Sequence, residues 1–89
     1  MLLANVIGHV VATAKHPTFE GFKMMIVQPV NPEGLPSGRQ MMAVDSVGAG
    51  VGERVLVVVE GRSAGDAVGN RRAPLDAAIV GIVDRIDPV

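Results

Sequence analysis

The chain has 89 residues, a length that suits one domain and is too short for two. It contains no cysteine, which excludes disulfides, thiol catalysis and cysteine-based metal sites. A formal net charge of −1 gives no general attraction for nucleic acids or anionic membranes, and no apolar run approaches the roughly 18 residues of a membrane-spanning helix. We therefore treat residues 1–89 as a single domain that does not span a membrane.

The apolar content predicts strands. Hydrophobic residues make up 48% of the chain, yet only Phe19 and Phe22 are aromatic, so most of this content is Val, Ile, Leu, Ala and Met. Many of these residues are β-branched, which favours pleated structure. The scarcity of aromatic rings also weighs against a surface that stacks single-stranded nucleic acid bases.

The first half of the chain predicts two strands and a long loop. Residues 2–13 alternate, and the set expected to face the core is Ala4, Val6, Gly8, Val10 and Ala12. Pro17 predicts a loop as far as Gly21, followed by a strand over about 22–30. Three prolines and two glycines between 29 and 38 then predict a long hairpin loop.

The second half predicts three more strands, over about 39–47, 54–60 and 79–86. A glycine-rich turn, GAGVGE, separates the first two of them. A single helical turn is expected near 63–68, with Ser63 as its N-cap and Asp66 at the third position. Short strands separated by turns favour an all-β barrel or sandwich.

The strand at 54–60 is apolar on both faces. Val55, Val57 and Val59 alternate with Leu56 and Val58, whereas a barrel strand with one buried face should alternate apolar with polar residues. This pattern predicts self-association through the outer face. The alternative is a valine-rich strand whose outer side chains are simply exposed.

The sequence offers little evidence for a nucleotide-binding, metal or catalytic site. GAGVGE has glycines at 48, 50 and 52, but Glu53 stands where a dinucleotide fingerprint needs its third glycine, and a strand follows instead of a helix. The spacing of His9 and His16 fits no metal pair. Three aspartates admit an acid–base pair, although structural hydrogen bonds to loop amides are the favoured interpretation: Asp45, Asp76 and Asp84.

Several segments together resemble the shell-vertex proteins of bacterial microcompartments, the pentameric class called BMC-P, which includes the carboxysome and ethanolamine-utilisation vertex proteins. The segments are VVATAKHP, GFKMMIVQPVNPEG, AVDSVGAGVGERVLVV and PLDAAIVGIVD, which extend over nearly the whole chain. The combination of the third and fourth is highly specific. One departure is GRSAG at 61–65, where relatives often read GSSAR.

The resemblance implies a small five-stranded antiparallel, oligonucleotide-binding-like β-barrel with a short helical turn. It would assemble as a homopentamer that caps the vertices of an icosahedral shell tiled by hexameric proteins in the bacterial cytoplasm. It would have no catalytic activity, cofactor, nucleic-acid partner or membrane partner. By position, Gly48, Ala49 and Gly50 match the loop around the axial opening, so Ala49→Trp is expected to crowd the axis. Three further residues match positions in subunit or loop contacts: Lys15, Gln28 and Asp45.

Two alternatives stay open at this point. A monomeric barrel could bind single-stranded nucleic acid or another ligand, and its affinity for nucleic acid would then fall with salt. A small enzyme would need a pocket with titratable groups, which this set of residues does not supply.

Overall fold

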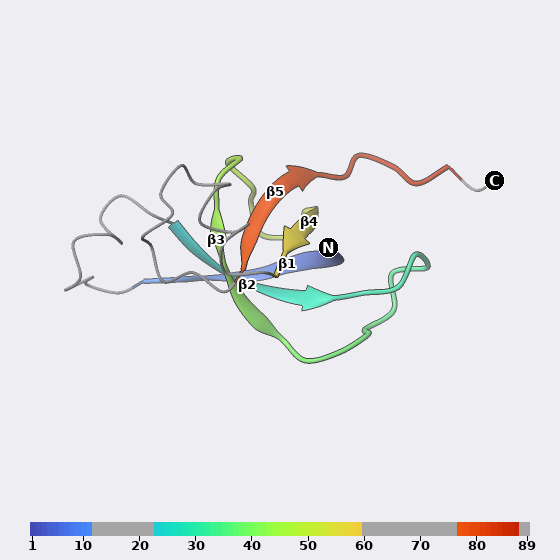
Figure 1. Ribbon diagram of the computed structural model, residues 1–89, viewed down its shortest axis with the longest axis horizontal. Coiled ribbons are helices and arrows are strands. Elements are labelled where there is room, and N and C mark those ends of the chain that lie inside the picture. Colours follow the sequence, from blue (N-terminus) through green and yellow to red (C-terminus); the bar gives the residue numbers. More distant parts are fainter. Residues whose placement is uncertain (12–22, 60–76, 88–89) are drawn as a thin grey trace.

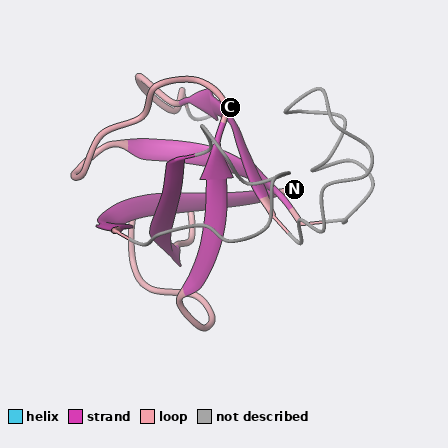
Figure 2. Ribbon diagram, turned by 90° about the vertical axis from the view of Figure 1, so that its left-hand side faces the viewer, coloured by secondary structure: helices cyan, strands magenta, loops and turns pink. Residues whose placement is uncertain are grey.

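Five strands form a closed barrel. The computed structural model describes residues 1–11, 23–59 and 77–87. The strands are β1 (Leu2–Val10), β2 (Lys23–Pro29), β3 (Met41–Asp45), β4 (Arg54–Val58) and β5 (Ala78–Ile82). Around the barrel they follow the order β1, β2, β3, β5, β4, and β4 pairs with β1 to complete the ring (Figures 1 and 2). The predicted five-stranded barrel is confirmed; the expected helical turn at 63–68 lies outside the described residues.

One neighbouring pair of strands is parallel. β3 and β5 run in the same direction, with Val44 opposite Ala78 and Asp45 opposite Ile79, and the other four pairs are antiparallel. Strand directions cannot alternate all the way round a ring with an odd number of members. A closed five-stranded barrel therefore contains at least one parallel pair, and the expectation of a wholly antiparallel barrel needs this correction.

The core is made of small and β-branched side chains. The interior of a five-stranded barrel is narrow, so side chains of modest size fill it without a void. Every strand contributes at least one fully or almost fully buried apolar residue, including Val6, Val27, Ala43, Val57 and Ile79. No buried side-chain nitrogen or oxygen in the described residues lacks a hydrogen-bond partner.

A β-bulge changes which face the end of β1 presents. Val6 lies opposite Val27, but Gly8 lies opposite Ile26, so Ile7 is an extra residue on β1. A bulge of one residue reverses the alternation beyond it. Gly8 and Val10 therefore share the outer face with Ile26 and Met24, and their expected inward orientation is wrong.

The chain leaves the barrel after β5. The last backbone hydrogen bond that joins this end of the chain to β4 runs from the amide of Val83 to the carbonyl of Arg54, at 2.8 Å. Because β4 begins at Arg54, residues 84–87 extend beyond the end of their partner strand. The final strand is consequently shorter than the predicted 79–86, and Ile86 lies outside the sheet.

Candidate functional site

The glycine loop, residues 46–53, joins β3 to β4. Gly48 and Gly52 have φ values of +80° and +93°, a backbone region that other residues rarely adopt. The loop is fixed to β1 by two hydrogen bonds, from the amide of Gly52 to the carbonyl of Val6 and from the amide of Val6 to the carbonyl of Glu53. It leads directly into a strand, so no helix N-terminus is present to hold a pyrophosphate.

Two carboxylates accept hydrogen bonds from amides of the glycine loop. Oδ1 of Asp45 accepts from the amides of Val47 and Gly48, at 3.0 and 3.1 Å. Oε1 of Glu53 accepts from the amide of Gly50, at 2.6 Å. Asp45 thus makes a loop contact within its own chain, as expected for an aspartate at the end of a strand. The sequence did not predict this role of Glu53. A carboxylate three residues after Gly50 is, however, at the right spacing to accept a hydrogen bond from the Gly50 amide.

The side chain of Ala49 faces the protomer's own core. It is 0% exposed and belongs to the same buried cluster as Val6 and Val55. Its carbonyl accepts a hydrogen bond from Nζ of Lys23, at 3.3 Å. Ala49→Trp would therefore disrupt the fold before it could crowd any axis. Ala49 is the one buried residue of the glycine loop, and its other residues are exposed or half-buried.

Gln28 also makes loop contacts within the chain. Its Nε2 donates to the carbonyls of Pro29 and Gly38, at 2.9 and 3.0 Å, and so connects β2 to the far end of the loop at 31–38. Inside that loop, Oδ1 of Asn31 accepts from the amides of Glu33 and Leu35. The remaining predicted contact residue, Lys15, lies outside the described residues.

Arg54 connects three parts of the chain, a role that the sequence did not reveal. Its Nε donates to Oδ1 of Asn5, at 3.1 Å, and its guanidinium lies against Gly34. A Cβ on Gly34 would lie 2.7 Å from an Nη atom of Arg54, so a side chain there would displace the guanidinium. The φ of +87° at Gly34 is a second reason why glycine suits this position.

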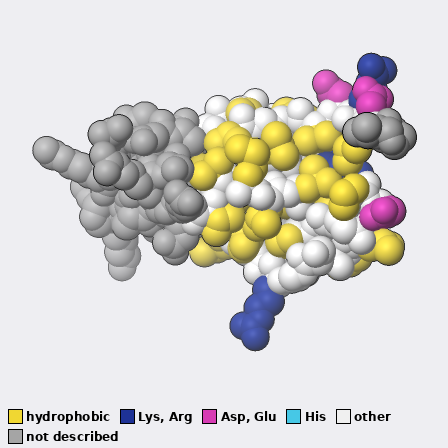
Figure 3. Space-filling model, turned by 45° about the vertical axis from the view of Figure 1, so that its right-hand side comes forward, with side chains coloured by type: hydrophobic (Ala, Val, Ile, Leu, Met, Phe, Trp, Pro, Cys, Tyr) yellow, Lys and Arg dark blue, Asp and Glu magenta, His cyan; other side chains and the backbone are white. Residues whose placement is uncertain are grey.

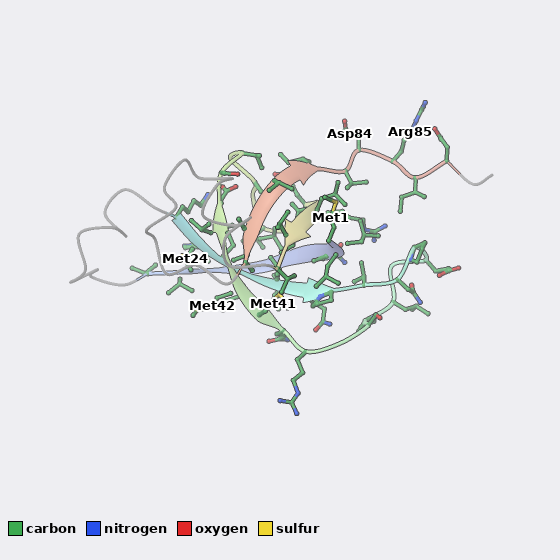
Figure 4. The ribbon with its side chains drawn as sticks, viewed as in Figure 1. Met1, Met24, Met41, Met42, Asp84 and Arg85 are labelled. Carbon is green, nitrogen blue, oxygen red and sulfur yellow. The ribbon has the colours of Figure 1, made fainter. Side chains whose placement is uncertain are left out.

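Beside Arg54 is a groove of about 650 Å³, which we call the C-terminal groove. It is lined by residues 5–7 of β1, by Pro32, Gly52 and Arg54, and by residues 83–86 of the segment after β5. Figure 4 shows Asp84 and Arg85 on this segment. Arg85 forms an exposed ion pair with Asp87, at 3.4 Å, which contributes little to stability.

Apolar side chains cover part of the outer surface of the barrel. In β4 the side chains of Val55 and Val57 are buried, whereas Leu56 and Val58 on the opposite face are half-buried. Figure 3 shows hydrophobic side chains gathered over the barrel, with charged groups toward its margins. Larger exposed apolar residues include Ile7, Leu35, Met42, Val51 and Ile86.

The described residues contain little that would support catalysis. No three histidine, aspartate or glutamate side chains in the described ranges come together as potential metal ligands. His9 is exposed, while His16 and Asp76 lie outside those ranges. Within the same ranges, no helix has the length and apolar character needed to cross a membrane.

Comparison with known proteins decides between the remaining alternatives. Residues 1–84 match the family described as "Ethanolamine utilisation protein EutN/carboxysome". The chain belongs to this family. The match covers all five strands, the glycine loop and the start of the segment after β5, and it ends before Arg85.

Relatives in the EutN/carboxysome family are shell vertex proteins. The microcompartment shell vertex protein GrpN of Rhodospirillum rubrum is 40% identical over 89 residues, covering 100% of this chain and 99% of GrpN. The carboxysome shell vertex protein CcmL of a Synechocystis species is 45% identical over 87 residues, covering 98% and 86% of the two chains. Both relatives are therefore shell vertex proteins, and neither name supports a nucleic-acid-binding role.

Solved structures agree with this assignment. An ethanolamine utilization protein EutN has a TM-score of 0.91 at 39% identity, covering 99% of this chain and 91% of its own. GrpN, described as a pentameric microcompartment shell protein, has a TM-score of 0.83 at 37% identity and covers 100% of both chains. The similarity to GrpN therefore extends over the whole of both compared chains.

Proposed function

We propose that five copies of this chain form a ring that closes a vertex of an icosahedral microcompartment shell in the bacterial cytoplasm. The observation that carries the proposal is the similarity to GrpN, a pentameric shell protein, over the whole of both chains. The exposed apolar surface of the single barrel supports it, because apolar patches on a small protein mark contact surfaces. Hexameric shell proteins are the partners around the ring.

The role of the ring is structural. Its curvature, set by five identical contacts between unlike surfaces, would fit a corner of the shell. In this proposal the glycine loop lies near the five-fold axis, with the exposed Gly48 and the half-buried Gly50 as its accessible small residues. Asp45 and Gln28 support the ring indirectly, because each fixes a loop of the protomer. The proposal involves no cofactor and no catalytic step.

Native mass spectrometry and negative-stain electron microscopy test this proposal directly. The expected species has five times the 9.2 kDa mass of the protomer and gives images with five-fold symmetry. A single-subunit mass that persists as the concentration is raised through the micromolar range would overturn the proposal. Salt-dependent binding of single-stranded oligonucleotides by such a monomer would favour the barrel's alternative role.

A further inference from the structure

We propose that the C-terminal groove binds a small aliphatic carboxylate, held by the side chains of Arg54 and Asn5. The groove is formed at one end of a single barrel, where the loop at 31–38 and the segment after β5 both lie (Figure 1). The proposal therefore does not depend on the ring. It goes beyond the proposed shell function, which requires no ligand.

A row of polar side chains crosses the outside of β2, β1 and β4. Asn5 lies opposite Arg54 on one side and opposite Gln28 on the other. The next residues along β1 and β4, Val6 and Val55, are buried in the core, so the three polar side chains share the outer face. Asn5 and Arg54 also line the groove.

Arg54 has more hydrogen-bond donors than its neighbours use. Its Nε donates to Oδ1 of Asn5, at 3.1 Å. Among the described residues, no oxygen accepts from its Nη atoms and no carboxylate forms an ion pair with it. The side chain is half-buried, and a charge that has lost part of its water favours a partner. The Nη atoms are therefore free to bind an anion.

The same hydrogen bond sets the orientation of the Asn5 side chain. Because Nε of Arg54 can only donate, the amide atom that faces it is the acceptor Oδ1. The Asn5 nitrogen Nδ2 is then left with its own N–H donors, for which the described part of the chain supplies no acceptor. A ligand in the groove thus meets unused donors from two neighbouring strands.

A carboxylate suits these donors. The planar guanidinium can pair with both oxygens of a carboxylate, and such charge-assisted hydrogen bonds are strong. The groove is lined by Arg54, Arg85 and Asp84, a formal charge of +1 in a chain whose net charge is −1. Figure 4 shows Asp84 and Arg85 on the segment after β5. This small positive excess matches a singly charged carboxylate better than a doubly charged phosphate.

Apolar side chains beside the donors indicate what the rest of the ligand is. Ile7 and Ile86 line the groove and are 44% and 43% exposed, and Pro32 and Val83 also line it. An alkyl chain of a few carbons would remove part of this surface from water. The groove volume of about 650 Å³ is ample for such a molecule. The structure therefore favours a short aliphatic acid.

Titration with butyrate tests the site. In proton–nitrogen NMR spectra at constant pH and ionic strength, butyrate should shift the Nε signal of Arg54 and the Nδ2 signals of Asn5, with saturation in the millimolar range. Butyramide has the same shape without the charge, and chloride has the charge without the shape, so neither should reproduce these shifts. No shift with butyrate, or equal shifts with chloride or butyramide, would overturn the proposal.

Matched variants separate the site from general charge attraction. Arg54→Lys keeps the charge but loses the planar fork, and should weaken butyrate binding about tenfold. Arg39→Gln removes an exposed arginine outside the groove and should bind butyrate like the wild-type protein. Asp84→Asn removes a repelling charge and should strengthen binding about twofold. Equal weakening by Arg54→Lys and Arg39→Gln would overturn the site.

Asn5→Asp covers the case in which Arg54→Lys does not fold. It keeps the shape of the side chain but places a carboxylate beside Arg54 and removes the Nδ2 donors. Circular dichroism should show a folded protein, with butyrate binding weakened at least about tenfold. Undiminished binding would overturn the proposal. Native mass spectrometry reads the ring separately, so a monomer that still binds butyrate contradicts only the proposed function, and a ring that does not bind contradicts only the carboxylate site.

Discussion

The carboxylate of Glu53 lies 2.6 Å from the amide nitrogen of Gly50 and accepts its hydrogen bond. The amide of Glu53 donates in turn to the carbonyl of Gly50, at 3.1 Å, so the two residues close the turn from both sides. This reciprocal pair, together with the Val6 bonds, holds the glycine loop in one conformation immediately before β4.

Glu53→Ala should loosen this turn and lower the free energy of unfolding by about 1 kcal/mol, the usual net value of one hydrogen bond. Urea denaturation measures the change, and hydrogen exchange should show faster exchange of the Gly50 amide. Glu33→Ala is the control, because the Glu33 side chain accepts no hydrogen bond among the described residues, and it should leave both measurements unchanged. Equal effects of the two variants would contradict this role for Glu53.

Gly48→Ala should destabilise the protein by about 1 kcal/mol through backbone strain alone. Its φ is +80°, and a Cβ there would meet no atom within 4 Å, so steric crowding does not contribute. Gly81→Ala makes the same chemical change at a strand position, where the nearest contact is Cδ1 of Leu56 at an ordinary 3.9 Å. Gly81→Ala should be neutral or stabilise by about 0.5 kcal/mol. Thermal and urea unfolding of both variants would show whether the sign differs as expected.

Ala49→Leu should lower the free energy of unfolding by about 1–3 kcal/mol, because a methine and two methyl groups are added to a side chain that is already fully buried. Val51→Leu enlarges an exposed side chain two residues away and should change stability by less than about 0.5 kcal/mol. The urea denaturation midpoints of the Ala49→Leu and Val51→Leu proteins, measured on the monomeric chain, give this comparison. If Ala49→Leu unfolded like the wild-type protein, the inward position of this side chain would be contradicted.

Asn31→Ala should destabilise the loop at 31–38 by about 1 kcal/mol, because two amides lose their shared acceptor. Asn31→Asp keeps an acceptor oxygen in the same place and should retain most of that stability. Hydrogen exchange at Glu33 and Leu35 is the direct measurement. Faster exchange in both variants alike would mean that the side-chain oxygen does not hold this loop.

The strand positions were predictable from the sequence because short-range signals set them. Prolines and glycines interrupt the chain between runs of β-branched residues, and alternation identified Ala4 and Val6 as inward-facing. It also placed Val55 and Val57 on one face of their strand, which the structure shows to be the buried one. The sequence also indicated that β4 has apolar residues on its outer face. The structure agrees, since Leu56 and Val58 remain partly exposed in the single protomer.

Features that depend on pairing between strands were not predictable in the same way. The bulge at Ile7 exists only relative to β2, and alternation along β1 alone gave Gly8 and Val10 the wrong face. The burial of Ala49 depends on how the loop folds back over the barrel end. The contacts of Arg54 join residues 49 positions apart in sequence, for which no local pattern exists. The parallel pair, by contrast, follows from the odd number of strands once closure is assumed.

Closure of the barrel also limits how large an aggregate can grow. Each of β1 to β5 has a hydrogen-bonded neighbour on both sides, so none offers the free edge from which fibrils extend by adding strands. In the proposed ring, the described strands would therefore meet their neighbours through side-chain surfaces, at an angle that these surfaces set. Growth of such a ring stops when the circle is complete, so the product has a definite size.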